Sequence, residues 1–206
     1  MPTHSTRTRG AEERDLPEVE SLRADQAARR QRIIDAAQRF MLDVDYERIQ
    51  VKDVADEAGV ALGTLYRYFS SKDHLFACAL VAWSQGFGGH VERRSGGPTV
   101  DHVKATYRRA ARAFDRQPRV YRMLMLIQSS DDAHAQRAWR EFTRSLTSVF
   151  GGTLEGSRLT RDKQGDVISV MSAVLDQNLR SWQLGLQPIE AVYTAIDRAA
   201  DLIFGR

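Results

Sequence analysis

The sequence predicts an all-α protein, and three features of its 206 residues support this class. Apolar residues recur at spacings of three and four along most of the chain, and no segment of strand length alternates at period two. Glycine, proline or a capping residue stands at the expected helix boundaries. Because 42% of the residues are hydrophobic, the chain can also form a buried core. We therefore expect an N-terminal three-helix module that contains a helix-turn-helix, followed by a C-terminal helical domain.

The chain is predicted to divide into an arm and two helical domains. Residues 1–26 are polar, carry both signs of charge and lack apolar periodicity, which predicts a flexible arm. Residues 27–90 form the helix-turn-helix module. The segment RRSGGPT, at 93–99, combines charge, two glycines and a proline, and favours a hinge at 89–98. The second helical domain then occupies residues 98–206.

Breakers and caps set the limits of the predicted helices. The second helix of the module ends at Gly59, because glycine readily adopts a positive φ angle. The hydroxyls of Ser70 and Ser71 can cap the first amides of the fourth helix. The predicted helices run at about 27–43, 51–58, 61–69, from 70 to a glycine cluster at 86–89, and at about 100–116, 118–129, 132–150, 162–184 and 188–204.

Composition narrows the possible function classes. The single cysteine, Cys78, excludes an intrachain disulfide or a cysteine-rich zinc site, and we expect its thiol to be inert packing. The first 20 residues contain no apolar segment typical of a signal peptide, and no later segment approaches the ~18 apolar residues that span a bilayer. These features predict a cytoplasmic protein that does not contact a membrane. The formal charge of +3 is too small to indicate a polyanionic partner by itself.

No sequence pattern of an enzyme active site is found. The five histidines lack the spacing of metal ligands, and GFGGH at 86–90 follows a predicted helix and lacks the spacing of a dinucleotide-binding loop. Asp131 and Asp132 indicate the start of a helix instead of a catalytic pair, and no serine or cysteine nucleophile motif occurs. We therefore expect a protein that is not an enzyme and uses neither a metal nor a cofactor.

Two short helices on either side of Gly59 are typical of a helix-turn-helix, which lays its second helix in the major groove of B-DNA. Gly63 allows the backbone to approach DNA closely, and the hydroxyls of Thr64 and Tyr66 can bind phosphates or base edges. Leu62 can contact a thymine methyl group. The residues expected on or beside the outward face are Leu62, Gly63, Thr64, Tyr66 and Arg67.

Basic residues of the module provide candidate phosphate contacts. Lys72, at the start of the fourth helix, adds a cation beside free backbone amides, and this combination binds phosphate. Residues 27–90 carry eight basic and eight acidic residues, so binding must rely on local clustering of charge. Arg29 and Arg30, near the start of the first helix, belong to the densest basic cluster. They either reach phosphates or a minor groove or form a solvated helix start.

The run VADEAGVALGTLYRYFSSKDHL, residues 54–75, resembles the N-terminal signature of the TetR family of transcriptional repressors. The resemblance implies a homodimer that binds double-stranded operator DNA and carries a ligand-binding C-terminal domain. It also implies that seven residues occupy DNA-contacting positions: Gln50, Lys52, Leu62, Thr64, Tyr66, Tyr68 and Lys72. The sequence departs from the family pattern at Gln50, where Thr or Ser is usual, and at Asp45, where Gly is usual.

The last two predicted helices supply candidate residues for the dimer interface. Their apolar stripes are wide, and alanines at four-residue spacing allow a close approach between helices. The resemblance implies a four-helix bundle between two chains, whereas the alternative is that the stripes only complete the core of one chain. The interface residues predicted on this basis are Val174, Ile189, Val192, Ile196, Ala199 and Ile203.

Methionines and aromatic residues of the C-terminal domain suggest a ligand pocket. Such residues form an adaptable apolar lining, and the resemblance implies a cavity here, although each residue alone is equally typical of a core. Asn178 is a candidate polar group that fixes the ligand, or it is satisfied by a backbone carbonyl. The residues predicted to line the pocket are Tyr107, Phe114, Met123, Met125, Trp139, Phe142, Met171, Asn178 and Trp182.

Residues 46–75 and the closing helices are similar to KstR-type repressors of steroid and cholesterol breakdown. This similarity implies a small apolar effector of the steroid or fatty acyl-CoA type. The function predicted is therefore a transcriptional repressor that releases operator DNA on binding such an effector. The alternative is a helical enzyme or carrier that binds a small molecule and retains a vestigial helix-turn-helix.

Overall fold

The computed structural model describes residues 16–17, 19–88 and 99–205. Over these ranges the regular structure is helical and contains no strand, which confirms the predicted all-α class. The elements are η1 (Val19–Ser21), α1 (Ala24–Asp43), η2 (Tyr46–Arg48), α2 (Val51–Glu57), α3 (Leu62–Leu65), α4 (Lys72–Gly88), α5 (Thr99–Arg116), α6 (Pro118–Ile127), α7 (Ala133–Gly152), α8 (Arg161–Gln183) and α9 (Ile189–Phe204).

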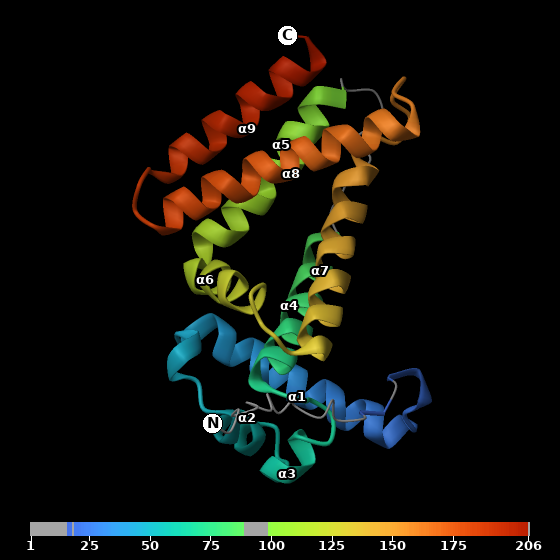
Figure 1. Cartoon of the computed structure of the whole chain (residues 1–206), viewed down its shortest axis with the longest axis vertical. Helices are drawn as coiled ribbons and strands as arrows, with labels where there is room; N and C mark the ends of the chain where they lie inside the picture. Colours follow the sequence, from blue (N-terminus) through green and yellow to red (C-terminus); the bar gives the residue numbers. More distant parts are fainter. Residues whose placement is uncertain (1–15, 18, 89–98, 206) are drawn as a thin grey trace, which may run out of the picture.

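The helices form two groups that α4 and α7 connect (Figure 1). Helices α1, α2 and α3 lie at one end of the molecule, and α5, α8 and α9 lie at the other. Helix α4 packs on α1 and along α7, so it belongs to the helix-turn-helix end and also reaches the second group. Helix α6 lies between the groups and contacts both α1 and α8. A displacement of α4, α6 or α7 therefore bears directly on the orientation of α1–α3.

Local capping explains where several helices begin. Ser71 Oγ accepts a hydrogen bond of 3.0 Å from the backbone N–H of His74, which confirms the predicted cap of α4. Asp132 caps α7 by accepting hydrogen bonds from the backbone N–H groups of His134 and Ala135. Gly59 has a φ angle of 67°, as expected for a glycine that ends α2 and turns the chain toward α3.

Two helix limits differ from the prediction by three or more residues. Helix α1 begins at Ala24, inside the predicted arm, because Gln26 Oε1 accepts a 3.1 Å hydrogen bond from the N–H of Arg23 and stabilises the first turn. Helix α3 ends at Leu65 instead of continuing to residue 69. Hydrogen bonds from residues i+3 to i tighten the chain there, at 3.1 Å from Arg67 to Thr64 and 2.9 Å from Tyr68 to Leu65.

The predicted flexibility of residues 1–15 and the hinge at 89–98 lie outside the described residues. The domain limits at 27–90 and 98–206 therefore stay predictions.

In the second group, Tyr107 stacks on Phe150 with ring centroids 4.0 Å apart. Helix α9 is held against α5 by ion pairs between Lys104 and Asp201, at 2.6 Å, and between Arg108 and Asp197.

Candidate nucleic-acid interface and ligand cavity

The α2–turn–α3 unit presents a short exposed helix on a buried support. Leu65 and Phe69 are fully buried and anchor α3 against the module. On the other side Gly63 and Arg67 are exposed, and Leu62 keeps 39% of its surface in contact with solvent. Thr64 and Tyr66 are partly exposed beside them. This arrangement matches the outward face expected from helical spacing, whereas the DNA contacts of its residues stay predictions.

The start of α2 supplies two further exposed polar side chains. Gln50 is the N-cap residue of α2, and its side chain makes no capping hydrogen bond. Lys52, in the first turn of the same helix, is exposed. Because neither side chain is buried, both are available for the DNA contacts that the sequence predicts.

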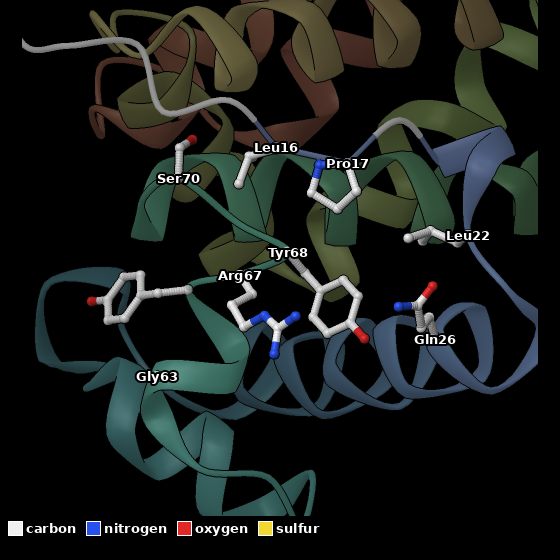
Figure 2. Close-up of a pocket in the computed structure, with 9 residues that line it drawn as sticks. Leu16, Pro17, Leu22, Gln26, Gly63, Arg67, Tyr68 and Ser70 are labelled. Carbon is white, nitrogen blue, oxygen red and sulfur yellow. The ribbon is translucent and has the colours of Figure 1, made fainter.

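A hollow of about 910 Å³ lies between α3 and the segment that leads into α1. Figure 2 shows the side chains of Arg67 and Tyr68 beside each other in this hollow. The residues that line it are Leu16, Pro17, Leu22, Gln26, Gly63, Tyr66, Arg67, Tyr68 and Ser70. Tyr68 is largely buried, so only its edge on the hollow is open to a ligand. A polyanion in the hollow would face the Arg67 guanidinium.

A second, smaller hollow of about 260 Å³ has Arg29 of α1 in its lining, close to the α2–turn–α3 unit. This unit is called the reading unit from here on. Arg29 lines this space together with Thr64 and Arg67, although they are 35 or more positions apart in the sequence. Two guanidinium groups and a hydroxyl around one polar hollow are suited to a phosphate group. The structure thus unites Arg29 of the predicted basic cluster with the outward face of α3.

Arg30 contacts the interior of the module, and its predicted contact with DNA stays a prediction. Its guanidinium lies 5.3 Å from the centroid of the Phe69 ring, and Nη2 donates a 3.4 Å hydrogen bond to Cys78 Sγ. Adjacent positions on a helix differ by about 100° in direction, so Arg29 and Arg30 have different surroundings. Burial raises the pKa of the Cys78 thiol to about 11, which keeps it protonated and agrees with inert packing.

Lys72 contacts protein carbonyl groups, and its predicted contact with phosphate stays a prediction. Its Nζ donates a 2.8 Å hydrogen bond to the carbonyl oxygen of Ile49 and another to that of Tyr46, and it lies 4.2 Å from the centroid of the Tyr46 ring. Burial lowers the pKa of Lys72. The ammonium therefore ties the start of α4 to the residues that precede α2 and fixes the support of the reading unit.

Asp45, where the family pattern has glycine, connects the helix-turn-helix end of the molecule to α6. Its Oδ1 lies 3.1 Å from Nε of Arg119 in the first turn of α6. The next residue, Tyr46, donates a hydrogen bond to Asp73 of α4. The segment ahead of α2 is thus bound to both α4 and α6.

A cavity of about 240 Å³ lies among α5, α6, α7 and α8. Three of the predicted pocket residues line it: Phe114, Trp139 and Phe142. The other lining residues are Tyr121, Leu124, Gln128, Thr143, Leu146, Thr147, Phe150, Ser172, Leu175, Asp176 and Leu179. Periodic spacing along α7 gives a signal for Leu146 and Phe150, because they continue the stripe of Trp139 and Phe142. The polar residues carry no such signal.

The other six predicted pocket residues do not line this cavity. Tyr107 is buried where it stacks on Phe150, and its hydroxyl lies 3.3 Å from the carbonyl oxygen of Ile168, to which it donates. Met123 and Met171 are fully buried, and Met125 and Trp182 are partly buried against the core. These five residues pack outside this cavity, and a role for them in ligand binding stays a prediction.

Asn178 is satisfied within the protein, which decides between the two roles considered for it. Its Nδ2 donates a 2.8 Å hydrogen bond to the carbonyl oxygen of Val174, and its Oδ1 accepts a 3.1 Å hydrogen bond from Gln187 Nε2. The side chain therefore joins α8 to the turn before α9 and is not free to fix a ligand.

Val192 and Ile196 are fully buried within the single chain, so their prediction as interface residues is wrong. They belong to the face of α9 that packs on α5 and α8. Val174, Ile189, Ala199 and Ile203 are partly buried. The apolar side chains that these helices and their connecting turn leave exposed are Val170, Leu184, Leu186 and Leu202, which the sequence analysis did not select.

No helix in the described ranges has both the length and the apolar character needed to cross a membrane. Within the same ranges, no group of three or more histidine, cysteine, aspartate or glutamate residues is arranged to hold a metal ion.

Comparisons with known proteins agree with this geometry. Residues 33–79 match the profile of the bacterial regulatory proteins of the tetR family. The HTH-type transcriptional repressor KstR of Mycobacterium tuberculosis is 30% identical over 182 residues, which cover 87% of this chain and 82% of the relative. A TetR transcriptional regulator from Rhodococcus sp. RHA1 has a TM-score of 0.76 at 26% identity, over 87% of this chain and 97% of that one.

The likeness of fold extends to more distant structures. FadR of Thermus thermophilus, a TetR family transcriptional repressor solved in complex with lauroyl-CoA, has a TM-score of 0.70 at 17% identity. The superposition covers 85% of this chain and 93% of FadR. Together with the relationship to KstR over most of both chains, these findings show that the protein belongs to the tetR family of bacterial regulatory proteins.

Proposed function

We propose that this protein is a ligand-responsive transcriptional repressor that binds operator DNA as a homodimer and releases it when an apolar effector enters the cavity. The observation that carries the proposal is the exposed face of α3. This helix follows the Gly59 turn directly and is anchored by the buried side chains of Leu65 and Phe69. The relatives at about 30% identity are named HTH-type transcriptional repressors.

Contacts with DNA are assigned by the chemistry of the exposed side chains. Thr64 and Tyr66 bind base edges or phosphates through their hydroxyls, and Leu62 contacts a thymine methyl group in the major groove. Arg29 and Arg67 bind a backbone phosphate at the hollow that they share. Phosphate contacts position the protein, while the residues of α3 select the sequence.

A homodimer is needed because one short reading helix contacts too few base pairs to be selective. The exposed leucines at positions 184, 186 and 202 supply apolar area for a partner subunit at the end of the molecule opposite α3. Two reading helices then occupy major grooves about 34–36 Å apart, or a multiple of this distance.

The effector site is the cavity of about 240 Å³. Its aromatic and leucine side chains suit an apolar molecule, and the similarity to KstR favours an effector of the steroid or acyl-CoA type. A ligand that fits only one arrangement of α6, α7 and α8 shifts the population toward it, which changes the distance between the two reading helices.

Selection of bound fragments from genomic DNA tests the proposal. The protein should enrich short palindromic sites, with affinity that falls as salt increases, because phosphate contacts release counterions. Mobility-shift assays on an enriched fragment, with and without candidate steroids and acyl-CoA thioesters, then measure the release. Enrichment of no sequence would contradict the repressor and favour a carrier or enzyme with a vestigial helix-turn-helix.

A further inference from the structure

We infer that the hydrogen bond between Trp83 and Gln117 restrains the cavity, so that an effector can be enclosed only when this bond breaks. Neither residue lines the cavity, and Trp83 is therefore a positioning residue that acts through the residues of the wall. The inference rests on the proposed ligand-responsive function and identifies what limits effector affinity. Three features support it: the contacts of Trp83 at one helix corner, the volume of the cavity, and the position of Trp83 on α4.

The side chain of Trp83 contacts the corner between α5 and α6, which comprises residues 114–118 and is called the α5–α6 corner. Its Nε1 donates a 3.0 Å hydrogen bond to Oε1 of Gln117, the N-cap residue of α6. Its ring centroid lies 5.3 Å from that of Phe114, near the end of α5, with an interplanar angle of 44°. The backbone N–H of Gln117 also donates to the carbonyl oxygen of Phe114 at 3.0 Å. Trp83 thus attaches both sides of the corner to α4.

The α5–α6 corner and the first turn of α6 form one wall of the cavity. Phe114 and Tyr121 both line it, and their rings meet edge to face with centroids 5.2 Å apart. Both side chains are buried. Because buried side chains are closely packed, a ligand that displaces the Phe114 ring pushes on the Trp83 ring or moves the corner. A change at this wall therefore reaches the bond between Trp83 and Gln117.

The volume of the cavity makes such a displacement necessary. Sites for drug-sized molecules usually measure ~300–1,000 Å³, whereas this cavity measures about 240 Å³. An effector of the proposed steroid or acyl-CoA type has to move the walls outward before it is enclosed. Helix α6 is the shortest of the helices that line the cavity, so we expect its end of the wall to move first. The arrangement in which Trp83 is bonded to Gln117 is thus the one with the smaller cavity.

Trp83 lies on the helix that supports the reading unit. It follows Lys72, the first residue of α4, by 11 positions, which corresponds to about 16 Å along the helix axis. Helix α4 packs on α1 near one end of the molecule and along α7. The bond between Trp83 and Gln117 therefore couples the position of the cavity wall to the position of α4.

Loss of the bond should strengthen effector binding. A protein whose binding-competent arrangement is only partly populated binds its ligand with an affinity reduced by that fraction. One hydrogen bond of this kind changes such a population by about three- to tenfold. Removing either partner should therefore raise the affinity for an effector, although neither Trp83 nor Gln117 lines the cavity. A merely structural contact would leave this affinity unchanged or weaken it when lost.

Isothermal titration calorimetry of the full-length protein with lauroyl-CoA and with testosterone tests the inference. For each probe that the wild type binds, Trp83→Phe and Gln117→Leu should lower the dissociation constant by about three- to tenfold. Phenylalanine keeps an aromatic ring beside Phe114 and removes the N–H donor, whereas leucine removes the acceptor. The double variant should gain no more than either single variant, because both substitutions remove the same bond.

Two further variants provide the controls. Gln117→Glu keeps an acceptor for the indole N–H and should bind the probes like the wild type. Trp182→Phe changes another partly buried tryptophan outside the lining and should leave the dissociation constant unchanged. An unchanged or larger dissociation constant in Trp83→Phe and Gln117→Leu, or an equal gain in Trp182→Phe, would overturn the inference.

Mobility-shift titration on an enriched operator fragment separates this inference from the proposed function. Trp83→Phe and Gln117→Leu should release the fragment at a lower concentration of the probe than the wild type. If the wild type binds a probe but no DNA fragment, the proposed repressor falls, whereas a gain in probe affinity in the two variants still supports the restraint. Should neither probe bind the wild type or the variants, the cavity would not be the effector site and the inference would fall.

Discussion

Ser70 Oγ donates a 2.7 Å hydrogen bond to Asp132 Oδ2, and this contact joins the residue ahead of the α4 cap to the N-cap of α7. A second contact runs in the opposite direction, from Ser130 Oγ to Asp73 Oδ2 at 2.5 Å. Together these four residues form a junction between the turn that follows α3 and the turn between α6 and α7. The reading unit is thus attached to the helices that form the cavity.

The charge of Asp132 stabilises this junction. Burial alone would raise the pKa of the carboxyl group, but hydrogen bonds from Ser71, Ser70 and the backbone N–H groups of Ala135 and His134 outweigh it. Their combined effect lowers the pKa of Asp132 to about 2. The carboxylate therefore remains ionised at neutral pH and keeps its contacts on both sides of the junction.

Ser130→Ala tests the junction. The substitution removes the donor to Asp73 in a largely buried place, so the free energy of unfolding should fall by about 1–2 kcal/mol. Operator affinity should fall several-fold as well, because the start of α4 supports the reading unit. Chemical denaturation and fluorescence anisotropy measure the two effects. In the control Ser129→Ala, an exposed hydroxyl bonded only to the carbonyl of Leu126 is lost, and an equal loss there would refute the special role of Ser130.

His74 makes stability depend on pH. Its ring stacks on His134 with centroids 5.2 Å apart, and its Nδ1 accepts a hydrogen bond from the N–H of Ser70. Burial and the positive charges nearby lower the pKa of His74 to about 4, although the Asp132 carboxylate opposes this. The charged and titratable groups that act on it are His134, Asp132, Arg30 and Arg137.

Between pH 6.5 and about 4 the unfolded chain therefore binds a proton at His74 that the folded chain does not. The free energy of unfolding should fall across this window, by up to roughly 3 kcal/mol from this group alone. His74→Asn keeps an acceptor and removes the titration, so urea denaturation from pH 7.5 to 4.5 should show a smaller decrease in the variant. His102→Asn on α5 should behave like the wild type, and a decrease unchanged in His74→Asn would contradict the assignment.

Tyr66→Ala should reduce specific operator affinity by at least about tenfold, since a direct contact in the major groove contributes about 1–3 kcal/mol of discrimination. The side chain is partly exposed, so the folded state and the dimer should persist. Mobility-shift titration and sedimentation measure these properties. Tyr66→Phe separates the hydroxyl from the ring, and normal operator affinity in Tyr66→Ala would remove the residue from the reading face.

Arg67→Gln should reduce the dependence of DNA binding on salt. A phosphate contact contributes about 0.9 to the slope of log affinity against log salt concentration, per subunit. The comparison is Arg39→Gln on α1, whose guanidinium already pairs with Glu57 at 3.0 Å. The slope of log affinity against log salt concentration, measured by anisotropy, should become smaller in magnitude for Arg67→Gln and stay the same for Arg39→Gln. An unchanged slope in the first variant would exclude a phosphate contact at Arg67.

Leu202→Glu should dissociate the proposed dimer. Leu202 is 84% exposed in the single chain, so glutamate is tolerated by the subunit itself but places a charge in an apolar interface. Analytical ultracentrifugation should show monomers with unchanged helical circular dichroism and weak operator binding. Leu126→Glu replaces another exposed leucine, on α6 instead of α8, α9 or their connecting turn, and should leave the dimer intact. A dimeric Leu202→Glu protein would exclude this residue from the interface.

Local signals in the sequence were sufficient for the fold. Gly59, Ser71 and Asp132 each act within a few residues of their own position, through a positive φ angle or a capping hydrogen bond, so their roles follow from their neighbours. Aromatic residue type, together with the family resemblance, likewise selected Phe114 and Trp139, which line the cavity. These features need no knowledge of how distant helices pack.

Roles that depend on tertiary contacts could not be predicted in the same way. Arg30 and Lys72 have the charge that DNA binding needs, but their targets are Cys78 and two backbone carbonyls that only the folded chain brings near. Val192 lies on an apolar stripe, and a stripe does not reveal whether its partner is the same chain or another copy.

Because Arg119 pairs with Asp45, α6 contacts both the cavity and the helix-turn-helix end of the molecule. The same helix presents Tyr121 and Leu124 to the cavity, and its first turn holds the segment directly ahead of α2. An exposed ion pair contributes at most about 1 kcal/mol, so it can break and re-form without loss of the fold. A ligand that rotates α6 by a few degrees therefore has a mechanical route to the segment ahead of α2 that does not pass through α4.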